Sequence, residues 1–364
     1  MLKKFFTLII VAVLFTATSF SQNYQKPKNI ILLIGDGFGL SQVSASIISS
    51  KDNPLKEFKS IGLVNTSSAD NLITDSAAGA TALATGYKTK NGRLCIDENG
   101  NIIENIIAIA QKKKMSTGVI ATSSITNATP AAFLSHQLSR KDEFEIAEQI
   151  TNSNVDILFG AGTDFFLSSN SDGKRNDSKN LIDSLINHGY ELIKTPDELL
   201  TKSITKKSFG LFGQYALPHA NKRNYSLGLL TKSAIKYLSK NKNGFFLMIE
   251  GSQIDWAAEK NDEEYLFSEI NDFLTAIDEA LKFAKQNKNT LVIVTADHDT
   301  GSAGITGYDS DKKQIKLTWA TNHHTANFVG IFSYGPSANL FTGFLNNYEI
   351  GRKLINLIDP SKKF

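Results

Sequence analysis

Six short runs of apolar residues constrain the fold of this chain most strongly. They are NIILLI (29–34), GVIATS (118–123), VDILFG (155–160), FFLMIE (245–250), LVIVTA (291–296) and FVGIFSY (328–334). Each run is continuous rather than alternating, which is typical of strands covered on both faces. Helical patterns lie between several of them, notably at 102–114 and 262–285. Strands that alternate with helices predict an α/β fold with a mostly parallel central sheet and helices on both faces.

The rest of the composition is that of an ordinary globular protein. The 364 residues are 41% hydrophobic and 21% charged, and the formal charge of +3 is too small to indicate a nucleic-acid or membrane-surface partner. Residues 161–225 are richer in Ser, Asn, Asp and Lys, and we interpret them as connections and short helices over the end of the sheet. No internal repeat is visible, so we predict a single domain over residues 22–364.

The first 21 residues form the pattern of a secretory signal peptide. Lys3 and Lys4 precede an apolar run at 5–15, and the small residues Ser19 and Ser21 then bracket Phe20, so we predict cleavage after Ser21. The run is too short for a membrane anchor, which needs about 20 apolar residues. No second hydrophobic span follows, and the single Cys95 excludes an internal disulfide. The chain is therefore expected to be exported, to the periplasm or out of the cell.

Polar residues with metal-binding side chains follow several of the predicted strands. Because parallel strands present their carboxyl ends at one edge of a sheet, where ligands bind, these residues are expected to converge. Asp36 follows the first run, and Thr126, Asn127 and Thr129 follow the second, before a predicted helix that carries Arg140. Glu250 and Asp255 come at and after the end of the run at 245–250. The last candidates are the triplet Asp297, His298 and Asp299 and the pair His323 and His324.

Each candidate also has an ordinary structural explanation. Asp36 lies between two glycines and suits a turn, Glu250 could cap a helix, and Asp297 could pair with a lysine. The convergence favours metal ions instead, because carboxylates packed together need cations between them. A mixed oxygen and nitrogen set suits Zn²⁺, and a purely oxygen corner suits Mg²⁺.

The segment TDSAAGATALATG (74–86) places Ser76 at the start of a predicted helix among small residues. A first-turn serine is an ordinary structural feature, but a helix N-terminus is also an anion site. A serine hydroxyl is a weak nucleophile until a base or a metal takes its proton. No nucleophile elbow surrounds Ser76, so activation by a metal is the simpler hypothesis.

These segments together resemble the alkaline phosphatase family. NIILLIGDG, TDSAAGATALATGYKTKNG, TPAAFLSHQLSR, IEGSQIDWA, TADHDTG and HTANFVGIFSYGP stand in the family's order and cover residues 29 to 336. The resemblance implies a three-layer α/β sandwich and metal-dependent hydrolysis of small phosphate monoesters through a phosphoserine. It also implies that a homodimer is a common state, and the short segment between His298 and His324 matches the compact bacterial members.

The resemblance assigns roles to individual residues. Ser76 matches the nucleophile, and Arg140 matches the arginine that holds the phosphate. Three residues match the zinc site that activates the serine: Asp36, Asp297 and His298. Two match the second zinc site: Asp255 and His324. The magnesium ligands are matched by Asp36, Thr129 and Glu250.

Two positions depart from the family pattern. The second zinc site takes a histidine four residues after Asp255, where this chain has Glu259. A carboxylate is able to bind zinc, so we predict that Glu259 coordinates it, with weaker catalysis or a harder metal as the consequence. Asn127 replaces an Asp or His near the magnesium site and is expected to tune metal affinity.

Two other functions stay open at this point. A phosphodiesterase or sulfatase on the same fold is the first, although Arg140 suits the dianion of a monoester better. A metal or phosphate binder that has lost catalysis is the second, because Glu259 adds negative charge to the second zinc site.

Overall fold

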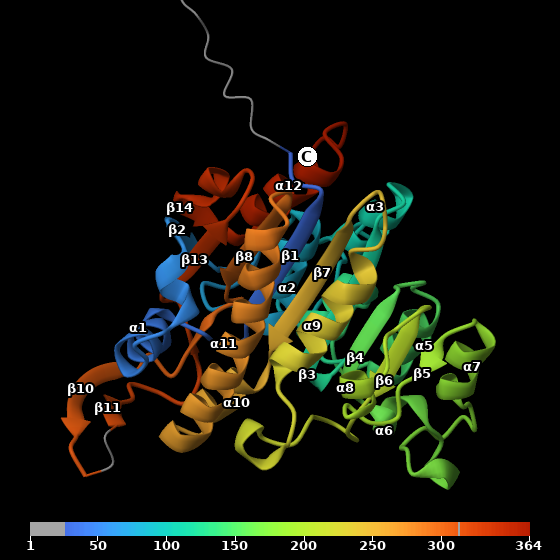
Figure 1. The fold of residues 1–364 in the computed structure, drawn as a ribbon, viewed down its shortest axis with the longest axis horizontal. Helices are drawn as coiled ribbons and strands as arrows, with labels where there is room; N and C mark the ends of the chain where they lie inside the picture. The colour runs from blue at the N-terminus through green and yellow to red at the C-terminus, as the bar shows by residue number, and fades with distance from the viewer. Residues whose placement is uncertain (1–25, 312–313) are drawn as a thin grey trace, which may run out of the picture.

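A 10-stranded sheet forms the centre of the molecule, in the order β14-β2-β13-β8-β1-β7-β3-β4-β6-β5 (Figure 1). The computed structural model describes residues 26–311 and 314–364. The predicted signal peptide, residues 1–21, lies outside the described residues. None of the described helices is long and apolar enough to cross a membrane.

All six predicted runs form strands of this sheet, which confirms the predicted α/β class. They are β1 (Asn29–Gly35), β3 (Ser116–Ser124), β4 (Ile157–Ala161), β7 (Phe245–Gly251), β8 (Thr290–Thr295) and β13 (Val329–Tyr334). The other four strands of this sheet were not predicted: β2 (Ser60–Asn65), β5 (Glu191–Leu192), β6 (Ser208–Leu211) and β14 (Gly343–Asn346). β2 and β5 are only partly buried, and β5, β6 and β14 have four residues or fewer, so none of them has a long apolar run.

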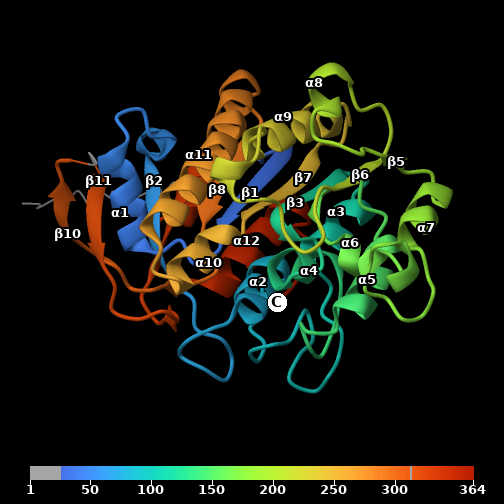
Figure 2. The same ribbon diagram turned by 90° about the horizontal axis from the view of Figure 1, so that it is seen from below.

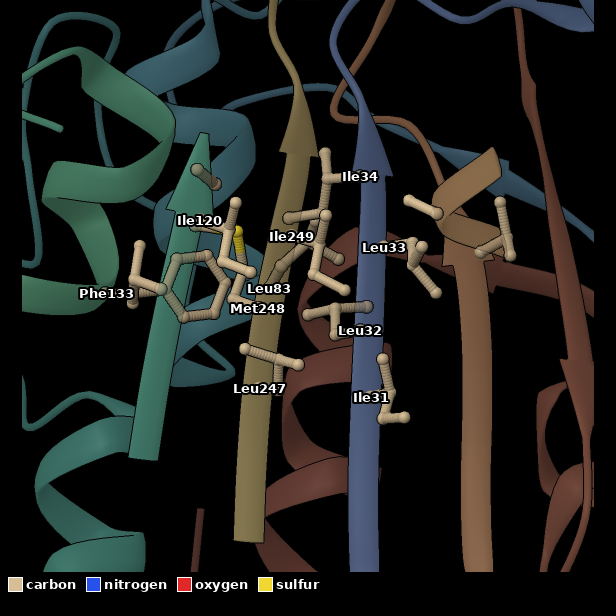
Figure 3. Packing of buried hydrophobic residues seen from close by; sticks show 14 of the residues in the cluster. Ile31, Leu32, Leu33, Ile34, Leu83, Ile120, Phe133, Leu247, Met248 and Ile249 are labelled. Atoms are coloured by element: carbon tan, nitrogen blue, oxygen red, sulfur yellow. The ribbon is translucent and has the colours of Figure 1, made fainter. Parts of the chain in front are cut away.

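The sheet is mostly parallel, as predicted. β1 pairs in parallel with β7 on one side and β8 on the other, whereas β13 runs antiparallel to β8 and β2. Apolar side chains of β1 and β7 fill the core on both faces, among them Ile31, Leu32, Leu247 and Met248 (Figure 3). Burial on both faces explains why the runs read as continuous rather than alternating.

Helices cover both faces of the sheet. Figure 2 shows α9 and α11 on one side, and α2, α4 and α12 on the other. The α-helices are α1 (Leu40–Ser49), α2 (Ser76–Thr85), α3 (Ile106–Lys112), α4 (Ala128–Leu134), α5 (Glu143–Thr151), α6 (Thr163–Phe166), α7 (Leu181–Asn187), α8 (Glu198–Thr201), α9 (Leu227–Leu238), α10 (Gln253–Glu259), α11 (Glu263–Gln286) and α12 (Asn347–Ile358). The short 3₁₀ helices are η1 (Pro54–Glu57), η2 (Ser169–Ser171), η3 (Ala220–Lys222) and η4 (Ala338–Phe341).

Two parts of the chain differ from their predictions. Residues 161–225 contribute short helices as predicted, but also β5 and β6, which extend the sheet at one edge. The helix that was predicted at 102–114 is shorter in the structure and corresponds to α3 alone, because Ile102 pairs with Ile96 in an isolated bridge and Asn105 caps the helix.

The segment between His298 and His324 holds the hairpin of β10 (Gly304–Asp309) and β11 (Gln314–Thr318), which projects beside α1.

Glu269 on α11 makes the stability of the fold depend on pH. It is 2% exposed, its Oε1 accepts a hydrogen bond from the Ala220 backbone N–H at 2.7 Å, and burial raises its pKa to about 7. The folded protein therefore binds a proton at Glu269 more tightly than the unfolded chain does. The stabilisation is complete below the ordinary pKa of 4.5 and is lost as the pH rises through 7.

We expect Glu269→Gln to remove this loss, since glutamine keeps a hydrogen-bond acceptor and carries no charge. Above the raised pKa the variant should exceed the wild type by up to about 3 kcal/mol in unfolding free energy, and below pH 4.5 the two should agree. Urea unfolding across pH measures this difference. Glu264→Gln, at an exposed position of the same helix, is the control, and equal gains in both variants would contradict the prediction.

Candidate active site

Three neighbouring strands carry acidic side chains to one edge of the sheet. Ile34 of β1 is level with Glu250 of β7 on one side and with Thr295 of β8 on the other. Asp36 directly follows β1, and Asp297 lies two residues after β8. Because the three strands run in the same direction, their carboxyl ends bring Asp36, Glu250 and Asp297 together, where the sequence analysis expected them.

The turn after β1 requires a glycine next to Asp36. Gly37 has a φ of +66°, and a Cβ there would lie 2.7 Å from Thr300 Oγ1 and 2.9 Å from Asp255 Oδ1. Any side chain would therefore clash with a group beside the site. The Gly37 N–H also donates to Asp297 Oδ1 at 3.2 Å. The close approach fixes Asp36 against the neighbouring strand end.

Cluster A consists of Asp36, Asp297 and His298, all buried, whose ligand atoms lie within 4.8 Å of one another. His298 Nε2 is 3.3 Å from Asp36 Oδ1 and 3.3 Å from Asp297 Oδ2. Neither oxygen accepts a hydrogen bond from any residue that the structure describes. Burial raises the pKa of Asp36 well above its usual range, and the charge of Asp297 raises it further. A divalent cation would satisfy these oxygens, so cluster A fits a metal.

Ser76 lies directly beside cluster A. It is the first residue of α2, whose N-cap is Asp75, and its Oγ is 3.2 Å from His298 Nε2. The small residues of α2 let the helix approach closely, since a Cβ at Gly79 would lie 2.9 Å from the Asp297 carbonyl oxygen. The predicted first-turn position of Ser76 is therefore confirmed. The hydroxyl lies at the positive end of a helix, next to the cation-binding groups.

Cluster B consists of Asp255, His298 and His324 and shares His298 with cluster A. His324 Nε2 is 3.5 Å from Asp255 Oδ1, and its Nδ1 is 3.0 Å from the Thr74 carbonyl oxygen. The His298 and His324 rings stack with centroids 3.6 Å apart. Burial opposes protonation of His324, but its contacts with Asp255 raise its pKa to about 9. A carboxylate and two imidazoles are a ligand set that suits zinc.

Thr129 and Glu250 form a third group that presents only oxygen atoms. Both side chains are fully buried, and neither Thr129 Oγ1 nor Glu250 Oε1 has a hydrogen bond of normal geometry within residues 26–311 and 314–364. The other carboxylate oxygen, Oε2, accepts from Ser252 Oγ at 2.6 Å. Burial raises the pKa of Glu250 to about 8. A buried group that presents only oxygen atoms fits a hard cation such as Mg²⁺.

Arg140 lies beside Asp75, the residue before Ser76, but not on the predicted helix. α4 ends at Leu134 and α5 begins at Glu143, so the expected helical position of Arg140 is wrong. The chain instead turns back, where the Arg140 N–H donates to the Gly92 carbonyl at 2.7 Å. The guanidinium lies 3.3 Å from Asp75 Oδ2 and is 28% exposed. A partly exposed guanidinium next to Asp75, the N-cap residue before Ser76, is placed to bind an anion at this helix end.

Glu259, the last residue of α10, is exposed and outside clusters A and B. Its predicted role as a zinc ligand therefore stays a prediction. Thr300 was missed by the sequence analysis: its Oγ1 donates to Asp255 Oδ1 and lies 3.2 Å from His298 Nδ1. The only signal for Thr300 was its place two residues after His298.

Comparison with known proteins agrees with this geometry. A family model described as alkaline phosphatase matches residues 27–315, which is well over half of the chain. The chain belongs to the alkaline phosphatase family. It is 39% identical to alkaline phosphatase 4 of Bacillus subtilis (strain 168), over 95% of this chain and 92% of that protein. It is 32% identical to alkaline phosphatase 3 of the same strain, over 94% and 91%.

Solved alkaline phosphatases share the fold. The structure from the Antarctic bacterium TAB5 matches with a TM-score of 0.85 and 39% identity, covering 92% of this chain and 98% of that one. A His 135 Glu variant of the TAB5 enzyme has Mg bound in its M3 site. Family membership makes the present chain a metal-dependent phosphomonoesterase, and the phosphodiesterase, sulfatase and binding-only alternatives are not favoured.

Proposed function

We propose that this phosphatase transfers the phosphoryl group of a monoester to Ser76 and then to water. The supporting observation is the 3.2 Å distance from Ser76 Oγ to His298 Nε2. The same nitrogen lies 3.3 Å from a carboxylate oxygen of Asp36 and 3.3 Å from one of Asp297. The hydroxyl thus adjoins the groups that would hold an activating cation. Divalent cations at the clusters would favour the serine alkoxide and neutralise charge on the phosphoryl oxygens.

Two displacements complete the proposed reaction. Ser76 Oγ attacks phosphorus, the bond from phosphorus to the ester oxygen breaks, and the alcohol leaves with that electron pair and a proton. Water then attacks the phosphoserine, the bond from phosphorus to Oγ breaks, and inorganic phosphate is released while Ser76 regains its proton. Arg140 binds two phosphate oxygens and holds phosphorus in line with Ser76 in both steps.

We assign metals to the three groups by the chemistry of their atoms. Cluster A would hold one Zn²⁺, and Asp255 with His324, joined by Glu259 where its carboxylate reaches them, would hold a second. Asp36, Thr129 and Glu250 would hold Mg²⁺, because they supply only oxygens. The Mg bound in the M3 site of the TAB5 variant supports a magnesium position in this chain too.

Further proposals concern the whole protein. We infer that the chain acts as one catalytic domain over residues 22–364, is exported after cleavage of the predicted signal peptide, accepts a broad range of small monoesters and forms a homodimer. The lysines and apolar run before residue 21 support export. The ten strands of one sheet, which run from Asn29 to Asn346, support a single domain.

Metal titration tests the proposal directly. We expect the metal-stripped protein to be inactive toward p-nitrophenyl phosphate and to regain turnover as Zn²⁺ is added at saturating Mg²⁺, with two zinc ions per chain at the plateau. The diester bis-p-nitrophenyl phosphate and the sulfate ester p-nitrophenyl sulfate are comparison substrates. No turnover of the monoester at any zinc level, in folded protein, would contradict the proposed function.

A further inference from the structure

A turn at Asn91 and Gly92 connects the two residues to which the proposed function assigns attack and phosphate binding, Ser76 and Arg140. The turn lies in the connection between α2, which begins at Ser76, and α3. Both of its residues stand in a segment that resembles the family, but the sequence analysis gave neither of them a role. In the structure, hydrogen bonds fasten the turn to the chain on both sides.

On one side, the Asn91 side chain holds the residues before Ser76. Its Oδ1 accepts from the Asp75 N–H at 3.1 Å, and its Nδ2 donates to the Ile73 carbonyl at 3.0 Å. Only one orientation of the amide satisfies both partners, because one is a donor and the other an acceptor. The Gly92 N–H adds a third bond, which it donates to Asp75 Oδ2 at 3.0 Å. The turn therefore fixes the backbone and the side chain of the N-cap residue of α2.

On the other side, the main chain of the turn holds the segment that carries Arg140. The Gly92 carbonyl accepts from the Arg140 N–H at 2.7 Å, and Leu94 and Gln137 exchange two backbone hydrogen bonds of 2.9 Å. Since Arg140 lies on neither α4 nor α5, these contacts place its main chain. Its guanidinium is 3.3 Å from Asp75 Oδ2, on the same residue that the turn holds.

The conformation of the turn depends on Gly92. Its φ is +84°, in the left-handed region that favours glycine. No described atom outside the turn lies within 4 Å of a Cβ built there, so a side chain would strain the backbone without a clash. Asp70 supports the turn as well, because its Oδ1 accepts from the Asn91 N–H at 3.0 Å.

We propose that Asn91 is a positioning residue, which sets the register between Ser76 and Arg140 and so strengthens phosphate binding. It acts through the backbone before Ser76 on one side and through Gly92 on the other. Transfer in line requires the guanidinium to hold phosphorus at a fixed distance and direction from the serine oxygen. A shift of one segment against the other therefore weakens the binding of phosphate. The inference rests on the proposed roles of Ser76 and Arg140.

The test measures binding of inorganic phosphate to the metal-loaded protein by calorimetry. We expect Asn91→Ala to weaken it about 3- to 10-fold, the effect of about one lost hydrogen bond. In an Arg140→Ala background the same change should have no further effect, because the guanidinium that the turn aligns is absent. Gly92→Ala strains the same turn and keeps the Asn91 side chain, so it should weaken phosphate binding too. If Asn91→Ala does not fold, Gly92→Ala decides in its place.

Asn241→Ala is the matched control. Asn241 is also half-buried, its Nδ2 donates to the Lys114 carbonyl at 2.9 Å, and its Oδ1 accepts from the Asn243 N–H at 2.9 Å. It lies at the other end of the sheet, because its Nδ2 also donates to Ser116 Oγ at the start of β3, at 3.1 Å. We expect a comparable fall in Tm in Asn241→Ala and Asn91→Ala, but a loss of phosphate affinity in Asn91→Ala alone.

Three results would overturn the inference. The first is unchanged phosphate affinity in folded Asn91→Ala. The second is an equal loss with and without Arg140, which would show that the turn does not act through the guanidinium. The third is an equal loss in Asn241→Ala, which would indicate a general effect of lower stability. If Arg140→Ala binds phosphate as tightly as the wild type does, the proposed role of Arg140 fails, and this inference with it.

Discussion

Replacing Ser76 by alanine is expected to lower kcat by about 10⁴-fold or more, the usual cost of removing a nucleophile. The reason is local: Ser76 Oγ is the hydroxyl beside His298 Nε2 and cluster A, and alanine leaves no atom there to accept the phosphoryl group. The fold should survive, because Asp75 caps α2 and alanine suits a first helical turn. Turnover of p-nitrophenyl phosphate at saturating metal measures the loss.

Ser46→Ala is the matched control for this result. Ser46 is also a buried helical serine, but its hydroxyl donates to the Val43 carbonyl within α1. We expect this variant to keep its turnover and the Ser76→Ala variant to keep its Tm. Substantial turnover in metal-loaded Ser76→Ala would show that another group, or water directly, attacks phosphorus.

Glu259→His is expected to tighten binding of the second zinc by about 10-fold or more. Mutating a residue that only contacts a metal ligand already changes metal affinity by about 10-fold, and a direct ligand should contribute at least as much. Residue 259 is four positions after Asp255 on α10, so both side chains lie on the same face of the helix. An imidazole adds a zinc ligand without negative charge, whereas Glu259 is exposed and outside cluster B. Turnover at limiting Zn²⁺ should rise accordingly. Zinc competition with a chelator measures the affinity independently of activity.

Glu259→Gln separates the effect of charge from that of coordination. Weaker zinc binding in this variant would show that the wild-type carboxylate is a ligand, as the sequence analysis predicted. Unchanged binding would show that it contributes nothing to the site. If Glu259→His also leaves zinc binding unchanged, the side chain at 259 does not reach the second metal, and the expected gain is contradicted.

The strands and their ends could be predicted because burial on both faces leaves a strong pattern. Continuous apolar runs located β1, β7 and β8, and the polar residues at or just beyond the ends of these runs pointed to Asp36, Glu250 and Asp297. β2 was not predicted because only two of its six residues are buried, and β5 was not predicted because it has only two residues. Short or half-buried strands depend on their neighbours in the sheet, which the local sequence does not specify.

The loops around the site could not be predicted in the same way. Arg140 was expected on a helix, yet its position depends on a backbone hydrogen bond to Gly92, distant in sequence. Loop positions are set by such long-range contacts rather than by periodicity.

The most direct test of the central claim is to trap the intermediate. Metal-loaded wild-type protein is mixed with p-nitrophenyl phosphate, quenched in acid and digested, and its peptides are analysed by mass spectrometry. We predict one phosphoryl group on the peptide that contains Ser76, and none in the Ser76→Ala variant. An active protein that carries no phosphoryl group, or carries it on another residue, would contradict the assignment of Ser76 as the nucleophile.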